Sequence, residues 1–179
     1  MTRSSDPGKL PNPEIIDRLL RQIRSFAEPS EQETADDRLP AKQNIYKLAE
    51  SFGLRVRRGS GGDDSVVPIP EYYSEREARL AVARNVARVG IDRVKNQCHV
   101  DGRSPSPAND VCRLVNAREL DRGALDSIAA AILMPTEDFT RWARKLQRNE
   151  ELLADSYAVP IELARIRLEA LELFAEPAN

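Results

Sequence analysis

Residues 74–90 read SEREARLAVARNVARVG and contain the clearest helix start in the chain. Ser74 and Glu77 form a capping box, in which the serine hydroxyl accepts the amide of the third helical residue while the glutamate reaches back to the cap. The helix that follows is predicted to run to about residue 96. Apolar residues fall on one face at steps of three and four, namely Leu80, Ala83, Ala87, Ile91 and Val94. This stripe predicts that one side of the helix packs on a core.

Two arginines, Arg84 and Arg88, stand on the flank of this stripe and are four residues apart. Zinc peptidases place their two metal-binding histidines on a helix at this spacing. The stretch is therefore either an ordinary basic helix or a metal helix whose ligands have been replaced.

The composition indicates a soluble globular protein of 179 residues, with 41% hydrophobic and 31% charged residues. The net charge of −2 provides no overall field toward nucleic acid or an anionic membrane. The N-terminal stretch MTRSSDPGKLPNPE has no apolar signal region, and no apolar run is long enough to span a membrane. We therefore expect a cytoplasmic protein with no membrane partner, and we leave its oligomeric state open.

His99 is the single histidine of the chain, so one chain cannot build a two-histidine zinc site. Its neighbours suggest a relocated metal site from Cys98, His99 and Cys112 with Asp101 or Asp110. We favour instead a flexible loop with two reduced thiols, because adjacent Cys-His is a poor chelate. A disulfide between the two cysteines, or a Cys98/His99 nucleophile pair, is less favoured. No metal or cofactor is expected.

The N-terminal part, residues 1–39, is predicted to be a flexible terminus, a helix at 14–27 and an acidic linker at 28–39. The helix either docks on the rest of the chain or forms a dimer contact, and its pattern does not separate these. Residues 40–179 are predicted to form the main domain.

The main domain is predicted to begin with Pro40 opening a helix at 41–52 that stops at Gly53. Strands at 54–58 and 65–70 then form a small sheet or just a hairpin. Pro68 and Pro70 confine the second strand to an edge or a short piece.

Further along, residues 97–115 contain a long loop, and a helix over roughly 118–134 is stopped by Pro135. Thr136 is predicted to cap a helix at 136–149. Helices at 150–156 and about 160–174 complete the chain, with Pro160 in the first turn of the last.

Three features occur in order: the long capped helix after a small sheet, DSIAAAILMPTEDF at 126–139, and LLADSYAVPIELARIRLEAL at 152–171. Together they resemble the ImmA/IrrE family, whose IrrE N-terminal-like zinc peptidase domain cleaves phage-type or stress-response repressors. The resemblance covers residues from about 41 to 174. It implies an α+β, zincin-like fold: a small β-sheet packed on a predominantly helical bundle, with residues 14–27 as an extra helix.

The resemblance also implies a degenerate active site. Arg84 falls on the position of the first histidine, Asn85 on the general base and Arg88 on the second histidine. Counting back from Asp126, where the family has Asn or Asp, the glutamate ligand falls at about Arg122, with Glu119 and Asp121 close by. Guanidinium has no lone pair for zinc, and a carboxamide cannot take a proton from a metal-bound water.

The sequence therefore predicts a catalytically inactive, metallopeptidase-like protein (a pseudoenzyme) that acts by protein binding or regulation. The resemblance places it in bacteria or phage, in a phage, stress-response or toxin–antitoxin setting. One alternative is a DNA-binding transcription regulator that places residues 161–173 of its helix-turn-helix-like C-terminal pair in the major groove. Another is a sensor or enzyme that binds an anion through Arg84, Arg88 and Arg122.

Overall fold

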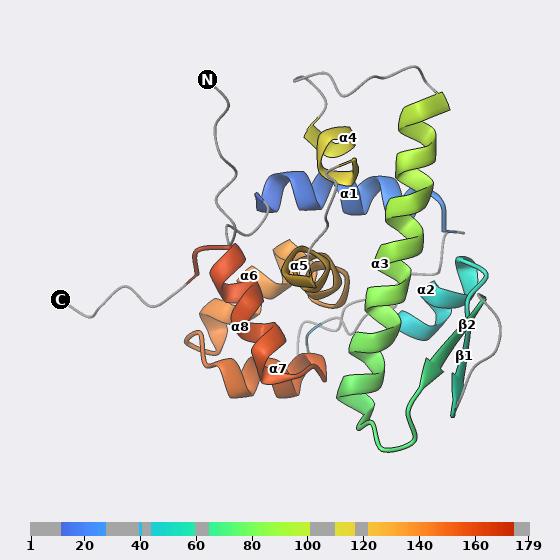
Figure 1. The fold of residues 1–179 in the computed structure, drawn as a ribbon. Helices are drawn as coiled ribbons and strands as arrows, with labels where there is room; N and C mark the ends of the chain where they lie inside the picture. Colours follow the sequence, from blue (N-terminus) through green and yellow to red (C-terminus); the bar gives the residue numbers. More distant parts are fainter. Residues whose placement is uncertain are drawn as a thin grey trace.

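The structure is a computed structural model that describes residues 12–27, 40, 44–59, 65–100, 110–116 and 122–173. Figure 1 shows that these residues form helices around a central helix, with a small sheet at one end. The elements are α1 (Pro13–Ser25), α2 (Ile45–Ser51), β1 (Arg55–Arg58), β2 (Val66–Ile69), α3 (Glu75–Val100), α4 (Asp110–Val115), α5 (Arg122–Leu133), α6 (Thr136–Lys145), α7 (Glu150–Tyr157) and α8 (Ile161–Ala170).

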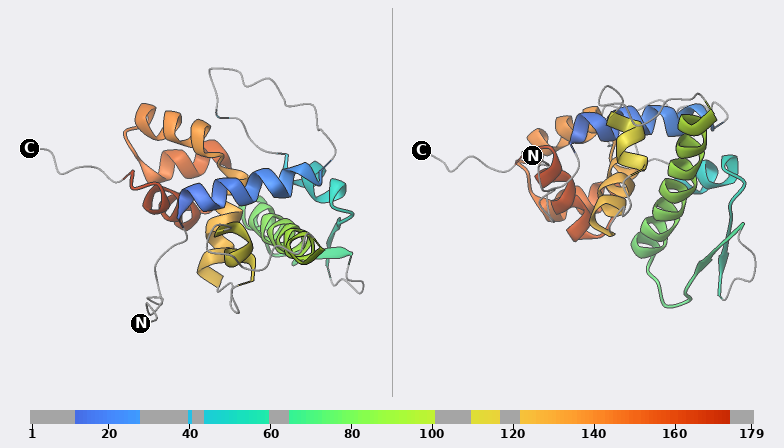
Figure 2. Two further views of the ribbon diagram at one scale, coloured as in Figure 1. Left: turned by 90° about the horizontal axis from the view of Figure 1, so that it is seen from above. Right: turned by 45° about the horizontal axis from the view of Figure 1, so that its top comes forward.

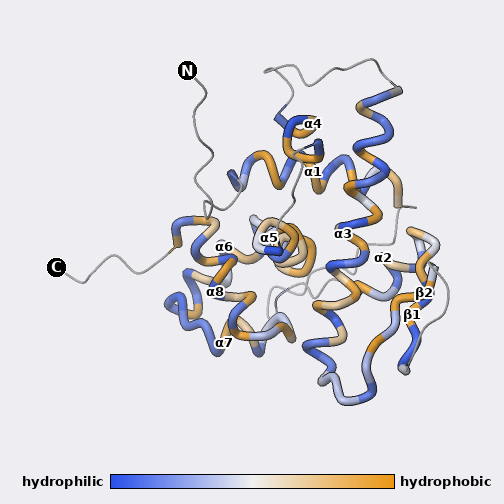
Figure 3. The backbone as a smooth tube through the Cα atoms, in the orientation of Figure 1, coloured by the Kyte–Doolittle hydropathy of each residue, from blue (hydrophilic) through white to orange (hydrophobic). Residues whose placement is uncertain are grey.

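The long helix α3 separates the two parts of the fold. The sheet and α2 pack on one side of α3, while α5 packs on its other side and carries α8 beyond it (Figures 1 and 2). All residues of α5 from Ser127 to Leu133 are buried, and Figure 3 shows this helix as mostly hydrophobic. The fold is therefore α+β with a mainly helical core, as predicted. In the ranges described, no helix has both the length and the apolar character needed to cross a membrane.

The two strands pair in parallel, from Arg55 opposite Val66 to Arg58 opposite Ile69. The predicted hairpin alternative is therefore wrong, although the small sheet is confirmed. A hairpin is joined by a short turn, whereas seven residues separate these strands, enough to return the chain to the start of a four-residue strand. Gly59 ends β1 with φ of 97°, a conformation that glycine adopts without a steric cost. Pro68 lies in an edge strand, as expected.

The start of α3 confirms the predicted capping box. The Glu77 amide donates to Ser74 Oγ at 3.3 Å, and the Ser74 amide donates to Glu77 Oε2 at 2.8 Å. The predicted face is buried at Ala83, Ala87, Ile91 and Val94, while Leu80 is half-buried. The helix continues to Val100, beyond its predicted end.

Helix α2 begins later than predicted. Asn44 caps it by accepting the amide of Lys47, a role that the side chain of Pro40 cannot fill. Its end at Gly53 is confirmed, since Gly53 has φ of 75° and the Leu54 amide donates to Ala49 O at 3.0 Å. These bonds form a Schellman motif.

The predicted loop at 97–115 contains a helix that the sequence analysis missed. Residues 110–115 form α4, which buries Val111, Cys112 and Val115. Cys112 forms a disulfide with Cys98 at the end of α3, with the Cα atoms 6.0 Å apart. The prediction of two reduced thiols is therefore wrong, because the two helices bring both buried cysteines together. His99 is exposed, and Asp101 lies outside the described residues.

Thr136 does not cap α6. Pro135 is the N-cap residue, and the Thr136 hydroxyl donates instead to Asp17 Oδ1 of α1 at 2.7 Å. The helix ends at Lys145, before the predicted position, because Gln147 and Arg148 adopt positive φ values of 52° and 59°. Pro160 precedes α8 as its N-cap residue.

The first helix packs on α3, α4 and α5 rather than standing apart. It buries Ile16, Leu19, Leu20 and Ile23 in the common core. The contact with α3 requires a glycine, because a Cβ atom at Gly90 would lie 2.8 Å from Ile23 Cγ2. Docking on the domain is therefore the alternative that the structure supports.

Candidate functional site at the α3–α5 crossing

An ion pair joins α3 and α5 at the position where the sequence analysis placed the first metal ligand. Arg84 Nε donates to Asp126 Oδ1 at 2.5 Å. The two side chains are 26% and 14% exposed, so water reaches the pair from one side. The carboxylate of Asp126, the residue from which the sequence analysis counted back to Arg122, is thus engaged by a guanidinium.

Asn85 and Arg88 follow on the same helix. The Asn85 side-chain amide donates to Ala81 O at 2.9 Å, one turn earlier. Its Oδ1 accepts a long hydrogen bond of 3.5 Å from Arg88 Nη1. Arg88 is exposed. A carboxamide held in this way offers no basic group for proton transfer.

Arg122 is the first residue of α5 and is exposed, one turn before Asp126. The three predicted arginines thus differ in state: Arg84 is paired, while Arg88 and Arg122 face solvent. The alternative ligand positions Glu119 and Asp121 lie outside the described residues.

The side chains at this crossing do not fit a zinc ion. They supply two guanidinium groups, one carboxamide and one carboxylate that is already paired with arginine, whereas zinc requires imidazole, thiolate or free carboxylate. Across the described part of the chain, no three His, Cys, Asp or Glu side chains are grouped so as to hold a metal ion. Cys98 and Cys112 are joined to each other.

The sequence analysis missed a buried arginine, Arg167, and the hydrogen bonds around it. Arg167 of α8 is 1% exposed and donates from Nε to Met134 O at 3.1 Å and from Nη2 to Thr136 Oγ1 at 2.5 Å. Burial lowers the pKa of Arg167 to about 10, against the opposing effect of Asp17. We call Arg167, Thr136 and Asp17 the Arg167 network. The available signal was the place of Arg167 on the buried stripe of Leu163, Ala164 and Leu168.

The described residues thus form a mainly helical α+β domain, with guanidinium, carboxamide and paired carboxylate groups at the α3–α5 crossing. Residues 107–169 match the family model of the IrrE N-terminal-like domain, Peptidase_M78. The match runs from before α4 into α8, and it confirms the family resemblance over these residues. Helix α3 with Arg84, Asn85 and Arg88 lies outside the matched segment. No curated protein and no solved structure matches the chain.

Proposed function

We propose that this protein is a catalytically inactive, metallopeptidase-like protein that works by binding a protein partner. The observation that carries the proposal is the ion pair between Arg84 and Asp126 across α3 and α5. It supports the proposal because the resemblance assigns Arg84 to the first histidine, and a guanidinium that binds the Asp126 carboxylate offers no lone pair to zinc.

The chemistry of the crossing supports this proposal. A guanidinium remains protonated at all physiological pH values and repels a divalent cation. Asn85 at the general-base position cannot activate a water molecule. Helix α3 lies on α5, and the side chains at their crossing offer neither a zinc ligand set nor a general base, which supports a role in binding rather than hydrolysis.

The class of partner follows from the family resemblance. The resembled peptidases act on repressor proteins, so we propose that this chain binds a repressor-like protein or a partner chain. The corresponding setting is phage regulation, a stress response or a toxin–antitoxin pair.

Metal analysis of protein purified without a histidine tag tests the loss of the zinc site. We expect zinc well below one equivalent per chain and no cleavage of a repressor-type substrate. One zinc per chain after dialysis, or zinc-dependent cleavage, would overturn the proposal.

A gain-of-binding variant tests whether these are the old ligand positions. Arg84→His, Asn85→Glu, Arg88→His and Arg122→Glu together rebuild the family's donor set. We expect this variant to bind one zinc more tightly than a control with Asp92→His and Asn96→His, which has the same spacing on the exposed face of α3. Equal affinities would show that α3 and α5 do not present a ligand geometry.

The two alternative functions gain no support from the described residues. The exposed face of α8 carries Glu162, Glu169 and Arg165, and Arg165 is paired with Glu150 at 2.8 Å. Such a face offers little to the phosphates of a duplex. For an anion site on the three predicted arginines, Arg84 is already engaged by Asp126.

A further inference from the structure

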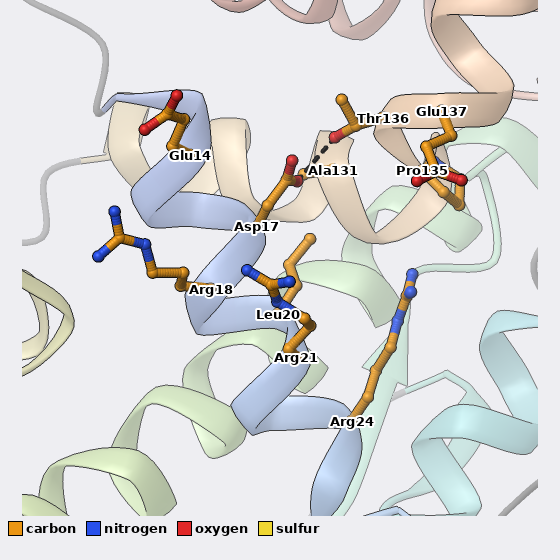
Figure 4. Close-up of a pocket in the computed structure, with 10 residues that line it drawn as sticks. All are labelled: Glu14, Asp17, Arg18, Leu20, Arg21, Arg24, Ala131, Pro135, Thr136 and Glu137. Carbon is orange, nitrogen blue, oxygen red and sulfur yellow. Dashed lines mark hydrogen bonds between the residues drawn. The ribbon is translucent and has the colours of Figure 1, made fainter.

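A cavity of about 480 Å³ lies between α1 and the junction of α5 and α6 (Figure 4). Ala131 of α5 lines it, five residues after Asp126, which places the cavity about 140° around α5 from the α3–α5 crossing. Its volume falls in the usual range for small-molecule sites, roughly 300–1,000 Å³. The cavity is therefore a separate feature from the degenerate metal site.

Helix α1 presents a row of arginines to this cavity, at Arg18, Arg21 and Arg24. Among the described residues, no ion pair or hydrogen bond engages their guanidinium groups. In Figure 4, Arg24 extends toward Pro135 and Glu137 on α6, whereas Arg18 points the other way. Desolvation lowers the pKa of Arg24, although Asp17 opposes the shift. The cationic end of Arg24 thus faces the groove without a bonded counter-ion among the residues that the structure describes.

The carboxylate nearest to this row is already engaged. Asp17 accepts the Thr136 hydroxyl, and it offsets the positive charge of buried Arg167. Arg167 Nη1 has no hydrogen-bond partner among the described residues. With Glu14 and Glu137 as the remaining acids, the lining of the cavity carries three carboxylates and three guanidinium groups. The lining is therefore balanced in charge, and an anion would be held locally, by arginines that no carboxylate among the described residues engages.

The wall opposite α1 adds a second attraction for negative charge. Pro135, the N-cap residue of α6, makes no side-chain hydrogen bond to the first turn of this ten-residue helix. Pro135 and Thr136 both line the cavity. The positive end of the α6 dipole favours an anion, which here would lie between the start of α6 and the arginines of α1.

We propose that this cavity binds a small anionic molecule through a phosphate or carboxylate group held by Arg21 and Arg24. Two guanidinium forks spaced three residues apart on one helix can each donate paired hydrogen bonds to such a group. The start of α6 completes the site from the other side. The ligand would thus connect α1 to the α5–α6 junction, at a place independent of the proposed loss of zinc chemistry.

Thermal unfolding and calorimetric titration with inorganic phosphate, and separately with succinate, test the site. At ten times the dissociation constant we expect the melting temperature to rise by about 3–6 °C. Arg21→Gln with Arg24→Gln should weaken binding about tenfold or more, because each lost charge-assisted bond is strong. Both side chains are exposed, so this variant is expected to fold. The phosphate and succinate titrations distinguish the two chemical sources of the anion.

Arg88→Gln is the matched control, since it removes an exposed arginine of α3 and should leave the affinity unchanged. If Arg88→Gln abolishes binding while the α1 variant does not, the anion binds at the α3–α5 crossing and the inference is wrong. If phosphate raises the melting temperature equally in the parent protein, the α1 variant and Arg88→Gln, it acts as a general salt. That result would also overturn the inference. Failure to bind either anion in the parent protein has the same consequence, and none of these results bears on zinc.

Discussion

Two helices that pack on α5 contribute arginines in opposite situations: Arg84 comes from α3 and Arg167 from α8. On one face, Arg84 meets Asp126 in a pair that is 26% and 14% exposed. On the other, Arg167 is 1% exposed and bonds to Met134 O and Thr136. Water can replace much of the first interaction but none of the second. The difference predicts that Arg84 contributes less to the stability of the fold than Arg167, which lies in none of the motifs of the sequence analysis.

The Arg167 network also connects more of the chain. Arg167 belongs to α8, Met134 and Thr136 to the α5–α6 junction, and Asp17 to α1. The ion pair of Arg84 joins only α3 and α5, which already share a broad apolar contact. Arg167 therefore belongs to a network that links α8, the α5–α6 junction and α1 by hydrogen bonds, whereas the Arg84–Asp126 pair adds a polar contact to helices that already pack together.

The sharpest test of this comparison is Arg167→Ala. The change leaves Met134 O and Thr136 without their buried donor and opens a void, so we expect the free energy of unfolding to fall by about 3–5 kcal/mol in denaturant titrations. Arg167→Met fills more of the space and should lose less.

Arg165→Ala provides the control on the same helix, because Arg165 is exposed and pairs only with Glu150. A small change is expected there. Equal losses at Arg165 and Arg167 would show that burial of the Arg167 network does not decide its contribution.

The next prediction tests the packing of α1 on α3, which holds Asp17 of α1 in the Arg167 network. Gly90→Ala would place a Cβ atom 2.8 Å from Ile23 Cγ2. Overpacking costs about 1–3 kcal/mol, and the better helix propensity of alanine returns about 1 kcal/mol, so we expect a net loss of up to about 2 kcal/mol. Chemical denaturation would measure it.

Ile23→Ala serves as the second change in a double-mutant cycle with Gly90→Ala. It should cost less in the Gly90→Ala background than in the parent protein, because it removes the clashing atoms. Strictly additive losses would contradict a steric contact between α1 and α3.

The sequence alone predicted features that depend on neighbours along the chain. The capping box of Ser74 and Glu77, the buried face of α3 and the glycine stop at Gly53 are of this kind. Each arises from bonds within one turn, and the residue types that make such bonds are recognisable in order.

The features that were missed depend on partners far apart in the chain. Thr136 bonds to Asp17 at a separation of 119 residues, and Arg84 to Asp126 at 42. Cys98 and Cys112 meet because α3 runs longer than expected and α4 follows it. For the site, the sequence indicated Arg84 and Asp126 by position, but their pairing required the packing of α3 on α5.

A smaller effect is expected at the crossing itself. A double-mutant cycle of Arg84→Gln and Asp126→Asn should give a coupling free energy of about 0.5–1 kcal/mol, since water screens the half-buried pair. The measurement is the midpoint and slope of urea unfolding for the four proteins. A coupling of about 3 kcal/mol or more would place this pair among buried ion pairs and would remove the contrast with Arg167.

A pH-dependent effect distinguishes two tyrosines. Burial and a hydrogen bond to Asp138 raise the pKa of Tyr157, which lies near Arg167, while burial and a bond to Glu75 raise the pKa of Tyr46 to about 12. A raised pKa stabilises the fold below the unfolded value of 10.0, and this contribution is lost as pH rises toward the folded value. Stability measured in urea should therefore fall between pH 10 and pH 12, less steeply in Tyr46→Phe than in the parent. Tyr157→Phe should also flatten the fall. The pKa of Tyr157 is raised further than that of Tyr46, so its phenolate absorbance should appear last, as the chain unfolds. Tyr157→Phe should therefore remove the last part of the rise in absorbance. Appearance of that absorbance near pH 10 instead would mean that the Tyr157 hydroxyl is as open to water as the α3–α5 crossing.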